Sequence, residues 1–192
     1  ASEDLPLVPG RTLGRYEILH ELASGGMATV YLGRALGVGG FERLVAIKCC
    51  HPHLRNDEQF AEMFLQEARL AARIHHPNVV ATLDVGHAND LYLVMDYVEG
   101  DPLSRLLQSA KRTGRPMPPA IALRIVTDAL AGLHAAHELR GSNGSLGLVH
   151  RDVSPQNIMV GTDGRAQLVD FGLAKATARA AASRDGSIKG KL

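Results

Sequence analysis

The 192-residue sequence predicts an α+β fold in which strands and helices are segregated along the chain. Short apolar runs typical of strands fill the first half, with a single helical pattern at 57–74 among them. After Gly100 two helical patterns dominate, and only one short hairpin follows them. Strand-rich sequence followed by helix-rich sequence favours an α+β fold over an alternating α/β fold.

The composition is that of a globular chain, with 45% apolar residues, 21% charged residues and a net charge of +1. This balance gives no support for nucleic-acid binding, and no run approaches the ~18 apolar residues of a membrane span. Cys49 and Cys50 are neighbours that face opposite ways on a strand, so a disulfide between them is not expected. Two free thiols favour a cytoplasmic location. The sequence starts without Met, so we expect it to be cut from a longer product.

The first half contains a hairpin, three further strands and one long helix. In the helix, Phe60 and Phe64 recur at helical spacing and predict a buried stripe. Asn56 or Asp57 is the predicted N-cap. A small-residue tip at 23–28 joins the first two strands. The strands are expected at 16–22, 29–33, 44–50, 79–85 and 91–95.

The second half begins with two helices and ends in a segment without apolar periodicity. From Leu173 onward the chain is rich in Ala, Ser, Arg and Gly, and it is expected to be mobile. The expected elements before it are a short helix at 102–109, a loop at 111–119, a helix at 119–139, a flexible loop at 141–147, and a hairpin with strands at 158–160 and 166–169.

Three side chains able to act at a phosphate lie close together in the sequence: Asp152, Asn157 and Asp170. Asp152 and Asn157 lie in a polar loop, and Asp170 follows the predicted hairpin. A loop carboxylate beside a loop amide, with a second carboxylate brought alongside, suits a hydroxyl nucleophile and hydrated cations.

The first half offers complementary features. A glycine-rich hairpin tip lets backbone N–H groups approach phosphate oxygens that a Cβ would obstruct. Lys48 lies in an apolar strand and can bridge two phosphates, and Glu67 lies in the middle of the long helix. Taken singly, these features are also typical of an ordinary tight hairpin, a surface lysine and a solvent-facing glutamate. Their combination with the later polar cluster favours a phosphate site.

These motifs resemble those of the eukaryotic-like (Hanks-type) bacterial serine/threonine protein kinases. The matching strings are GGMATVY (25–31), VAIK (45–48), HRDVSPQN (150–157) and DFG (170–172). The resemblance implies a protein-kinase-like fold with an arm at 1–12, an antiparallel-sheet N-lobe with hinge at 13–99, and a partial C-lobe at 100–192. No A-P-E follows the activation segment. We therefore expect a catalytic domain truncated after that segment, with an exposed apolar side on helix 119–139, marginal stability and weak or no activity by itself.

The resemblance also implies that ATP binds between the lobes with Mg²⁺, or with Mn²⁺ as an alternative ion. Lys48, held by Glu67, would order the phosphates, Asp152 would position the acceptor hydroxyl, and Asn157 and Asp170 would hold the metal. For the apolar members of the nucleotide site, core packing is the alternative interpretation, and at Met159 both hold. The implied nucleotide contacts besides Lys48 are Ala23, Ser24, Gly25, Gly26, Met27, Val30, Ala46, Met95, Asp96, Val98, Asp101 and Met159.

Three positions depart from the family pattern. Ala23 and Ala28 stand where the hairpin tip has glycine, which is expected to weaken phosphate contact without abolishing it. Ser154 stands where many serine/threonine kinases carry Lys, which leaves the rate and the acceptor preference open. By resemblance, His150 is expected to be structural and to pack near Phe171.

The implied partners are proteins with Ser or Thr acceptors, and further copies of the chain for autophosphorylation. Candidate phosphosites are Thr177, Ser183 and Ser187, with Arg151 and Lys175 as partners for the phosphate. Two other functions stay open. A nucleotide-binding or scaffolding module without turnover fits the missing C-lobe helices, whereas DFG and the tail after it disfavour a small-molecule phosphotransferase.

Overall fold

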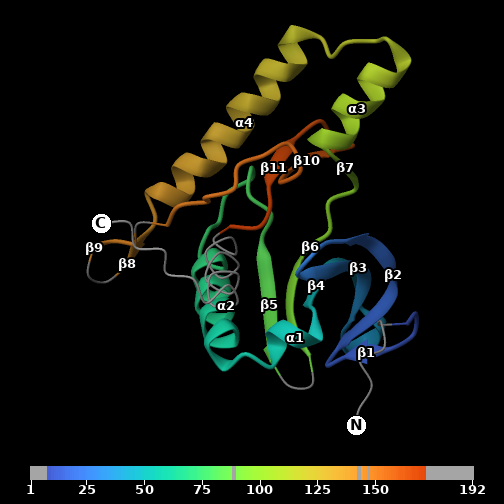
Figure 1. Cartoon of the computed structure of the whole chain (residues 1–192), viewed down its shortest axis with the longest axis vertical. Coiled ribbons are helices and arrows are strands. Elements are labelled where there is room, and N and C mark those ends of the chain that lie inside the picture. The colour runs from blue at the N-terminus through green and yellow to red at the C-terminus, as the bar shows by residue number, and fades with distance from the viewer. Residues whose placement is uncertain (1–7, 88–89, 142–143, 147, 172–192) are drawn as a thin grey trace, which may run out of the picture.

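The computed structural model describes residues 8–87, 90–141, 144–146 and 148–171. It confirms the predicted α+β fold. A curled antiparallel sheet with helix α2 beside it forms one end of the molecule, and helices α3 and α4 lie at the other end (Figure 1). The predicted mobile segment and phosphosites fall at 172–192, outside the described residues.

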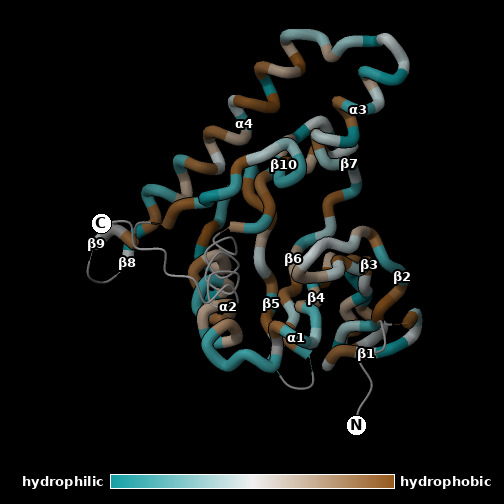
Figure 2. The backbone as a smooth tube through the Cα atoms, in the orientation of Figure 1, coloured by the Kyte–Doolittle hydropathy of each residue, from teal (hydrophilic) through white to brown (hydrophobic). Residues whose placement is uncertain are grey.

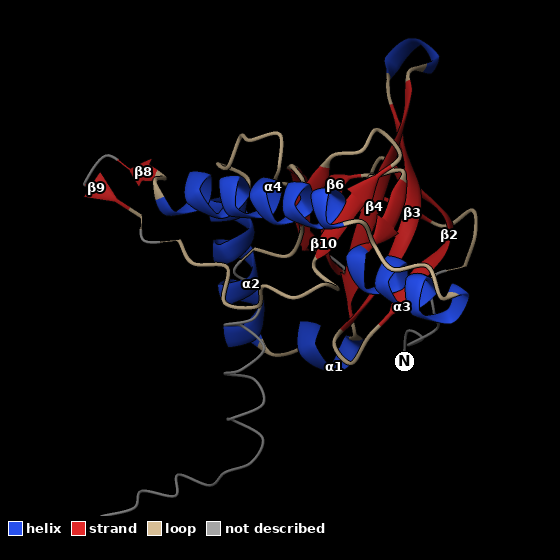
Figure 3. Ribbon diagram, turned by 90° about the horizontal axis from the view of Figure 1, so that it is seen from above, coloured by secondary structure: helices blue, strands red, loops and turns tan. Residues whose placement is uncertain are grey.

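Six antiparallel strands form the main sheet in the order β1-β2-β3-β4-β6-β5. The predicted strands are all present, and β2 and β3 extend beyond their expected ends because they pair with each other from Tyr16↔Ala35 to Ser24↔Thr29. The β3–β4 hairpin extends away from the body and ends at the 3₁₀ turn Val38–Gly40 (Figure 3). The bounds are β1 Thr12–Leu13, β2 Tyr16–Ser24, β3 Ala28–Leu36, β4 Glu42–Cys50, β5 Thr82–His87 and β6 Leu91–Asp96.

Helix α2 (Glu58–Ala71) packs its apolar stripe on one face of this sheet. Asp57 is the N-cap, because its Oδ1 accepts a hydrogen bond from the Phe60 backbone N at 3.1 Å. The helix ends at Ala71, three residues before the predicted end. A short helix, α1 (Pro52–Arg55), precedes it and was not predicted, since four residues carry no periodicity.

Two helices and two small sheets make up the second half. Helix α3 (Leu103–Thr113) runs into the region predicted as a loop, and Gly114 ends it in the left-handed conformation at φ 64°. Part of the expected loop at 141–147 instead forms the strand pair β8 (Arg140–Gly141) and β9 (Gly144–Ser145). Strand β7 (Gly100–Pro102), which was not predicted, joins the predicted hairpin of β10 (Ile158–Gly161) and β11 (Ala166–Leu168).

Helix α4 (Pro119–His137) lies across the β10–β11 hairpin and carries apolar residues on more than one side (Figure 2). Its inner side buries Ile125, Ala129 and Ala136. The expected exposed apolar side is confirmed. The exposed side chains, with 51–67% of their surface accessible, are Ile121, Leu123, Val126 and Leu130. No helix in the described part of the chain is long and apolar enough to cross a membrane.

Candidate active site

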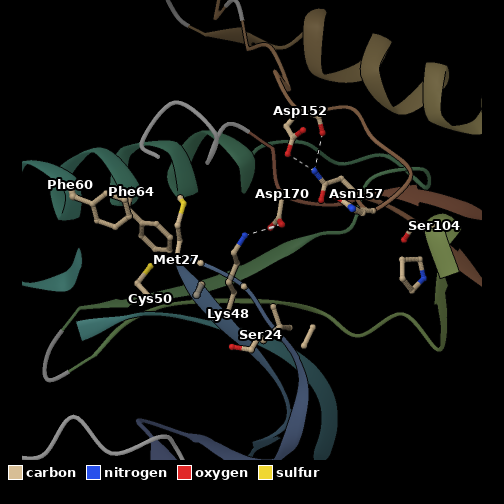
Figure 4. Close-up of a pocket in the computed structure, with 17 residues that line it drawn as sticks. Ser24, Met27, Lys48, Cys50, Phe60, Phe64, Ser104, Asp152, Asn157 and Asp170 are labelled. Atoms are coloured by element: carbon tan, nitrogen blue, oxygen red, sulfur yellow. Dashed lines mark hydrogen bonds and ion pairs between the residues drawn. The ribbon is translucent and has the colours of Figure 1, made fainter. Parts of the chain in front are cut away.

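A cavity of about 560 Å³ opens between the sheet and the polar loop of the second half (Figure 4). It brings together four of the five predicted catalytic residues, which are Lys48, Asp152, Asn157 and Asp170. Residues from six separate segments line it: Ala23, Ser24, Gly25, Gly26, Met27, Ala28 and Val30; Lys48 and Cys50; Phe60 and Phe64; Pro102 and Ser104; Asp152, Gln156 and Asn157; and Asp170.

The tip of the β2–β3 hairpin forms the roof of the cavity. The Gly25 backbone N donates to the Ala28 carbonyl at 3.0 Å, which closes the tip. A Cβ placed on Gly26 would meet no heavy atom within 4 Å, so the space beside this backbone is open to a ligand. The His51 backbone N donates to the Met27 carbonyl at 2.8 Å and ties the tip to the start of α1. The roof therefore fits the approach of phosphate oxygens to backbone N–H groups.

Strand alternation aims Lys48 into the cavity, because its neighbours Ile47 and Cys49 are buried on the opposite face of β4. Its Nζ lies 2.8 Å from Asp170 Oδ2 (Figure 4), and the two side chains are 18% and 26% exposed. An ammonium has three donors, so Lys48 can keep this contact and still meet phosphate oxygens.

Glu67 lies on the buried side of α2 and does not line the cavity. Lys48 pairs with Asp170 in the structure. The pairing of Lys48 with Glu67, implied by the family resemblance, therefore stays a prediction.

Asp152 and Asn157 form a bonded pair within the polar loop. The Asn157 side-chain amide donates to Asp152 Oδ2 and to the Asp152 backbone carbonyl, both at 2.9 Å (Figure 4). The amide N is directed at Asp152, which leaves Asn157 Oδ1 as an acceptor. With the Asp170 carboxylate it supplies oxygen donors of the kind that Mg²⁺ prefers.

The donor set fits Mg²⁺ held together with a nucleotide better than an all-protein metal site. In the described ranges, no group of three or more His, Cys, Asp or Glu side chains is arranged to bind a metal. Mg²⁺ is commonly held by one or two protein carboxylates plus phosphate oxygens and water. When bound, the ion would supply positive charge against the phosphates, with Asn157 and Asp170 as its protein ligands.

His150 organises the backbone around these side chains. It is 1% exposed, its Nε2 donates to the Val169 carbonyl at 2.8 Å, and its Nδ1 accepts from the Asp152 backbone N at 3.4 Å. Its ring lies 4.5 Å from that of Phe171, which confirms the predicted packing. Arg151 and Asp170 have φ of 67° and 63°, a left-handed conformation that costs non-glycine residues about 1–3 kcal/mol each. The hydrogen bonds of His150 help to hold both in place.

Two buried polar residues that the sequence did not single out hold strand β11, which leads to Asp170. Asn78 Nδ2 donates to the Ala166 carbonyl at 2.9 Å, and Asp128 Oδ2 accepts from the Ala166 backbone N at 3.1 Å. Asp128 also pairs with Arg124 at 2.9 Å. The sequence offered one signal for this role of Asp128, which is an acidic residue among the apolar positions of helix 119–139.

Most of the implied nucleotide contacts outside the hairpin tip do not line the cavity, with Lys48 and Val30 as the exceptions. Ala46 and Met95 face each other across β4 and β6, and Met159 pairs with Pro102. Val98 and Ala46 each pack against the apolar cluster that α2 forms with the sheet. The acids near the hinge have ion-pair partners: Asp96 with Arg43, and Asp101 with Arg105 at 3.1 Å. The contacts of these residues with the nucleotide stay predictions.

The cavity also has walls that the motifs did not reveal, notably Cys50, Phe60, Phe64, Ser104 and Gln156. Cys50 lies two residues after Lys48 on the same strand, so alternation alone could have placed it in the site. Phe60 and Phe64 were predicted as a buried stripe, and the structure shows that this stripe reaches the cavity. Burial raises the pKa of Cys50 to about 12, so its thiol is neutral.

The fold and the cavity together have the architecture of the protein-kinase class, with a curled sheet over a polar loop and a Lys–Asp pair between them. The protein kinase domain model matches residues 16–188. The chain belongs to the protein kinase domain family.

Relatives and solved structures agree with this assignment. The chain is 44% identical over 180 residues to the tyrosine-protein kinase MasK of Myxococcus xanthus, covering 93% of this chain and 28% of that protein. It is 34% identical over 187 residues to the serine/threonine-protein kinase PrkC of Bacillus subtilis, covering 97% and 27%. The crystal structure of the Mycobacterium tuberculosis PknI kinase domain superposes with a TM-score of 0.71 at 32% identity, covering 88% of this chain and 64% of that one. The chain thus spans under a third of the length of these two relatives.

Proposed function

We propose that the chain binds Mg·ATP in this cavity and transfers the γ-phosphoryl group to Ser or Thr hydroxyls of proteins. The observation that carries the proposal is the convergence of Lys48, Asp152, Asn157 and Asp170 on one cavity beneath a glycine-containing hairpin tip. Phosphoryl transfer needs positioning and charge stabilisation more than covalent chemistry from the protein, and these residue types supply both.

In this proposal each group has a separate task. Lys48, held by Asp170, offers N–H donors to phosphate oxygens beneath the hairpin tip. Asp152, oriented by the Asn157 amide at 2.9 Å, accepts the hydrogen bond of the acceptor hydroxyl and takes its proton as the new P–O bond forms. The bond between the γ-phosphorus and the oxygen that joins it to the β-phosphate breaks in the same step, and ADP leaves. The two buried free thiols support a cytoplasmic location. Self-association would bring a second copy of the chain close enough to act as the phosphate acceptor.

Tyrosine is a second candidate acceptor, and two observations favour it. One relative, at 44% identity, is named a tyrosine-protein kinase. Ser154 follows Asp152 by two positions and provides no charge at the transferring phosphate, unlike the Lys of many serine/threonine kinases. Matched peptides that differ only in Ser, Thr or Tyr at one position would separate the two candidates.

The test is transfer of labelled γ-phosphate from Mg·ATP to such peptides by the 192-residue chain and two variants. Asp152→Asn is expected to lower the transfer rate by about 10²–10⁴-fold, the usual contribution of a positioned acid–base group. Mg·ATP affinity, measured by calorimetry, should stay within about twofold, because Lys48 and Asp170 remain. Asp163→Asn, on the exposed β10–β11 turn outside the cavity, is the matched control and should keep the full rate.

Equal transfer by the Asp152→Asn variant and the unmodified chain would refute the role of Asp152. A chain that binds Mg·ATP but phosphorylates none of the peptides would support the nucleotide-binding or scaffolding module instead.

A further inference from the structure

The cavity contains a compartment whose chemistry does not suit nucleotide phosphates. Cys50 lies on the same face of β4 as Lys48, two residues further along. Around it stand Met27 from the hairpin tip and Phe60 and Phe64 from α2 (Figure 4). None of these four lining side chains carries a charge, and the neutral thiol of Cys50 behaves as a small apolar group.

The walls of this compartment are fixed by the core of the molecule. Cys50, Phe60 and Phe64 are 9%, 3% and 2% exposed and belong to the cluster that joins α2 to the sheet, and Met27 packs against the same cluster. The two phenyl rings lie 6.2 Å apart at 29°. Since the Met27 carbonyl is bonded to the His51 backbone N at 2.8 Å, the roof is also held in place. The compartment is therefore formed before any ligand arrives.

Charge indicates which kind of ligand fits. The cavity holds one cation, Lys48, and two carboxylates, Asp152 and Asp170, among its lining residues. Lys48 is already paired with Asp170 at 2.8 Å. An anion without Mg²⁺ would meet a net negative site, and a hydrated phosphate gains nothing from phenyl, thioether and thiol walls. A neutral alkyl or aryl group is favoured, because entering the compartment removes its own apolar surface from water.

We propose that the compartment formed by Met27, Cys50, Phe60 and Phe64 binds a neutral alkyl or aryl small molecule beside the nucleotide site, not in place of the nucleotide. Such a ligand touches the hairpin tip, β4 and α2 at once, so it links the phosphate-binding roof to the helix. A cavity of about 560 Å³ lies within the usual range for small-molecule sites, roughly 300–1,000 Å³. The inference rests on the cavity of the proposed function but not on phosphoryl transfer.

The test uses the 192-residue chain and a series of 1-alkanols from butanol to octanol as probes. Binding is followed by the NMR shift of the ¹³C-labelled methyl group of Met27, with Met117, in the separate cluster beneath α4, as the remote reporter. Each added CH₂ that is buried should tighten binding about fourfold. Saturating Mg·ATP should change the octanol affinity by less than about threefold, since each ligand has its own compartment.

Two variants at adjacent positions provide the matched control. Cys50→Leu fills the compartment and should weaken octanol binding at least about tenfold, whereas Cys49→Val changes the opposite face of β4 and should leave it within about twofold. An unchanged Met117 signal shows that a variant is folded. If Cys50→Leu does not fold, the chain-length series on the unmodified chain still decides.

Three results would overturn the proposal: affinity that does not rise with chain length, displacement of octanol by Mg·ATP, or equal weakening by both cysteine variants. Tighter binding of octanoate than of octanol would overturn the neutral ligand class. These measurements need no phosphotransfer, so their failure is distinct from failure of the proposed function.

Discussion

Helices α2 and α4 both support the cavity, but they are packed to different degrees. Helix α2 (Glu58–Ala71) is buried along one side, where Phe60, Phe64 and Ala68 pack in one apolar cluster against the sheet. Helix α4 (Pro119–His137) buries an inner side and leaves a second apolar side open to solvent, with Leu123 67% exposed.

The difference separates the two halves of the site. Lys48 lies on a strand whose two faces are both covered, one by the α2 cluster and the other by the cluster around Ile47. Asp152 and Asn157 lie on a loop that follows α4 and depends on contacts of β10 and β11 with its inner side. Because one apolar side of α4 is open to solvent, we expect that region to open more easily than the sheet. The two halves of the site then differ in stability rather than in chemistry.

The largest expected effect comes from replacing one apolar side chain with alanine on each of the two helices. Phe64→Ala should lower the free energy of unfolding by about 3–5 kcal/mol, because it removes a 2%-exposed ring from a packed cluster. Leu130→Ala should change it by less than about 0.5 kcal/mol, because that side chain is 59% exposed. Urea denaturation followed by circular dichroism measures both. Similar losses in the two variants would show that the outer side of α4 is covered in solution, and the comparison would fail.

The second test concerns the buried carboxylate that ties α4 to β11. Asp128→Ala should cost about 1–3 kcal/mol, because it leaves the buried Ala166 N–H without its acceptor. Arg124→Ala removes only the exposed partner of the ion pair, so about 0.5 kcal/mol or less is expected. Hydrogen exchange of the Ala166 amide gives a local readout. If both variants cost the same, the ion pair matters and the bond to β11 does not.

The smallest expected effect on stability comes from ionisation of the two thiols of β4, and it appears only at high pH. Burial raises the pKa of both Cys49 and Cys50 from 9.0 to about 12, so between these values the folded chain keeps protons that the unfolded chain releases. The contribution of the two protonated thiols to the free energy of unfolding is therefore complete below pH 9 and is lost as the pH rises towards 12. At pH 8, a thiol reagent should label neither cysteine of the folded chain and both after unfolding. Rapid labelling without denaturant would show that the sheet opens locally, against the comparison above.

Much of the fold could be predicted from the sequence, because the patterns that specify those elements lie within a few neighbouring residues. Strand alternation placed Lys48, the glycine tip marked the β2–β3 hairpin, and Asp57 was one of two candidate caps of α2. The misses were elements whose cause is not local. Strand β7 (Gly100–Pro102) forms because β10, far along the chain, pairs with it. The longer α3 is the exception, since its end after Thr113 has a local cause in the left-handed turn at Gly114. A strand of three residues or fewer, or a loop rich in glycine, has too little apolar periodicity for the sequence to reveal such pairing.

The sequence by itself determined the chemical groups of the site, because Lys48, Asp152, Asn157 and Asp170 lie in motifs with fixed spacing. Only the tertiary structure decided their contacts: Lys48 with Asp170 at 2.8 Å, and strand β11 held by Asp128. It also decided that the apolar stripe of α2 would reach the cavity beside Lys48 and leave an uncharged compartment there. The physical reason is that motif spacing is set along the chain, whereas a cavity wall depends on which distant surfaces pack against each other.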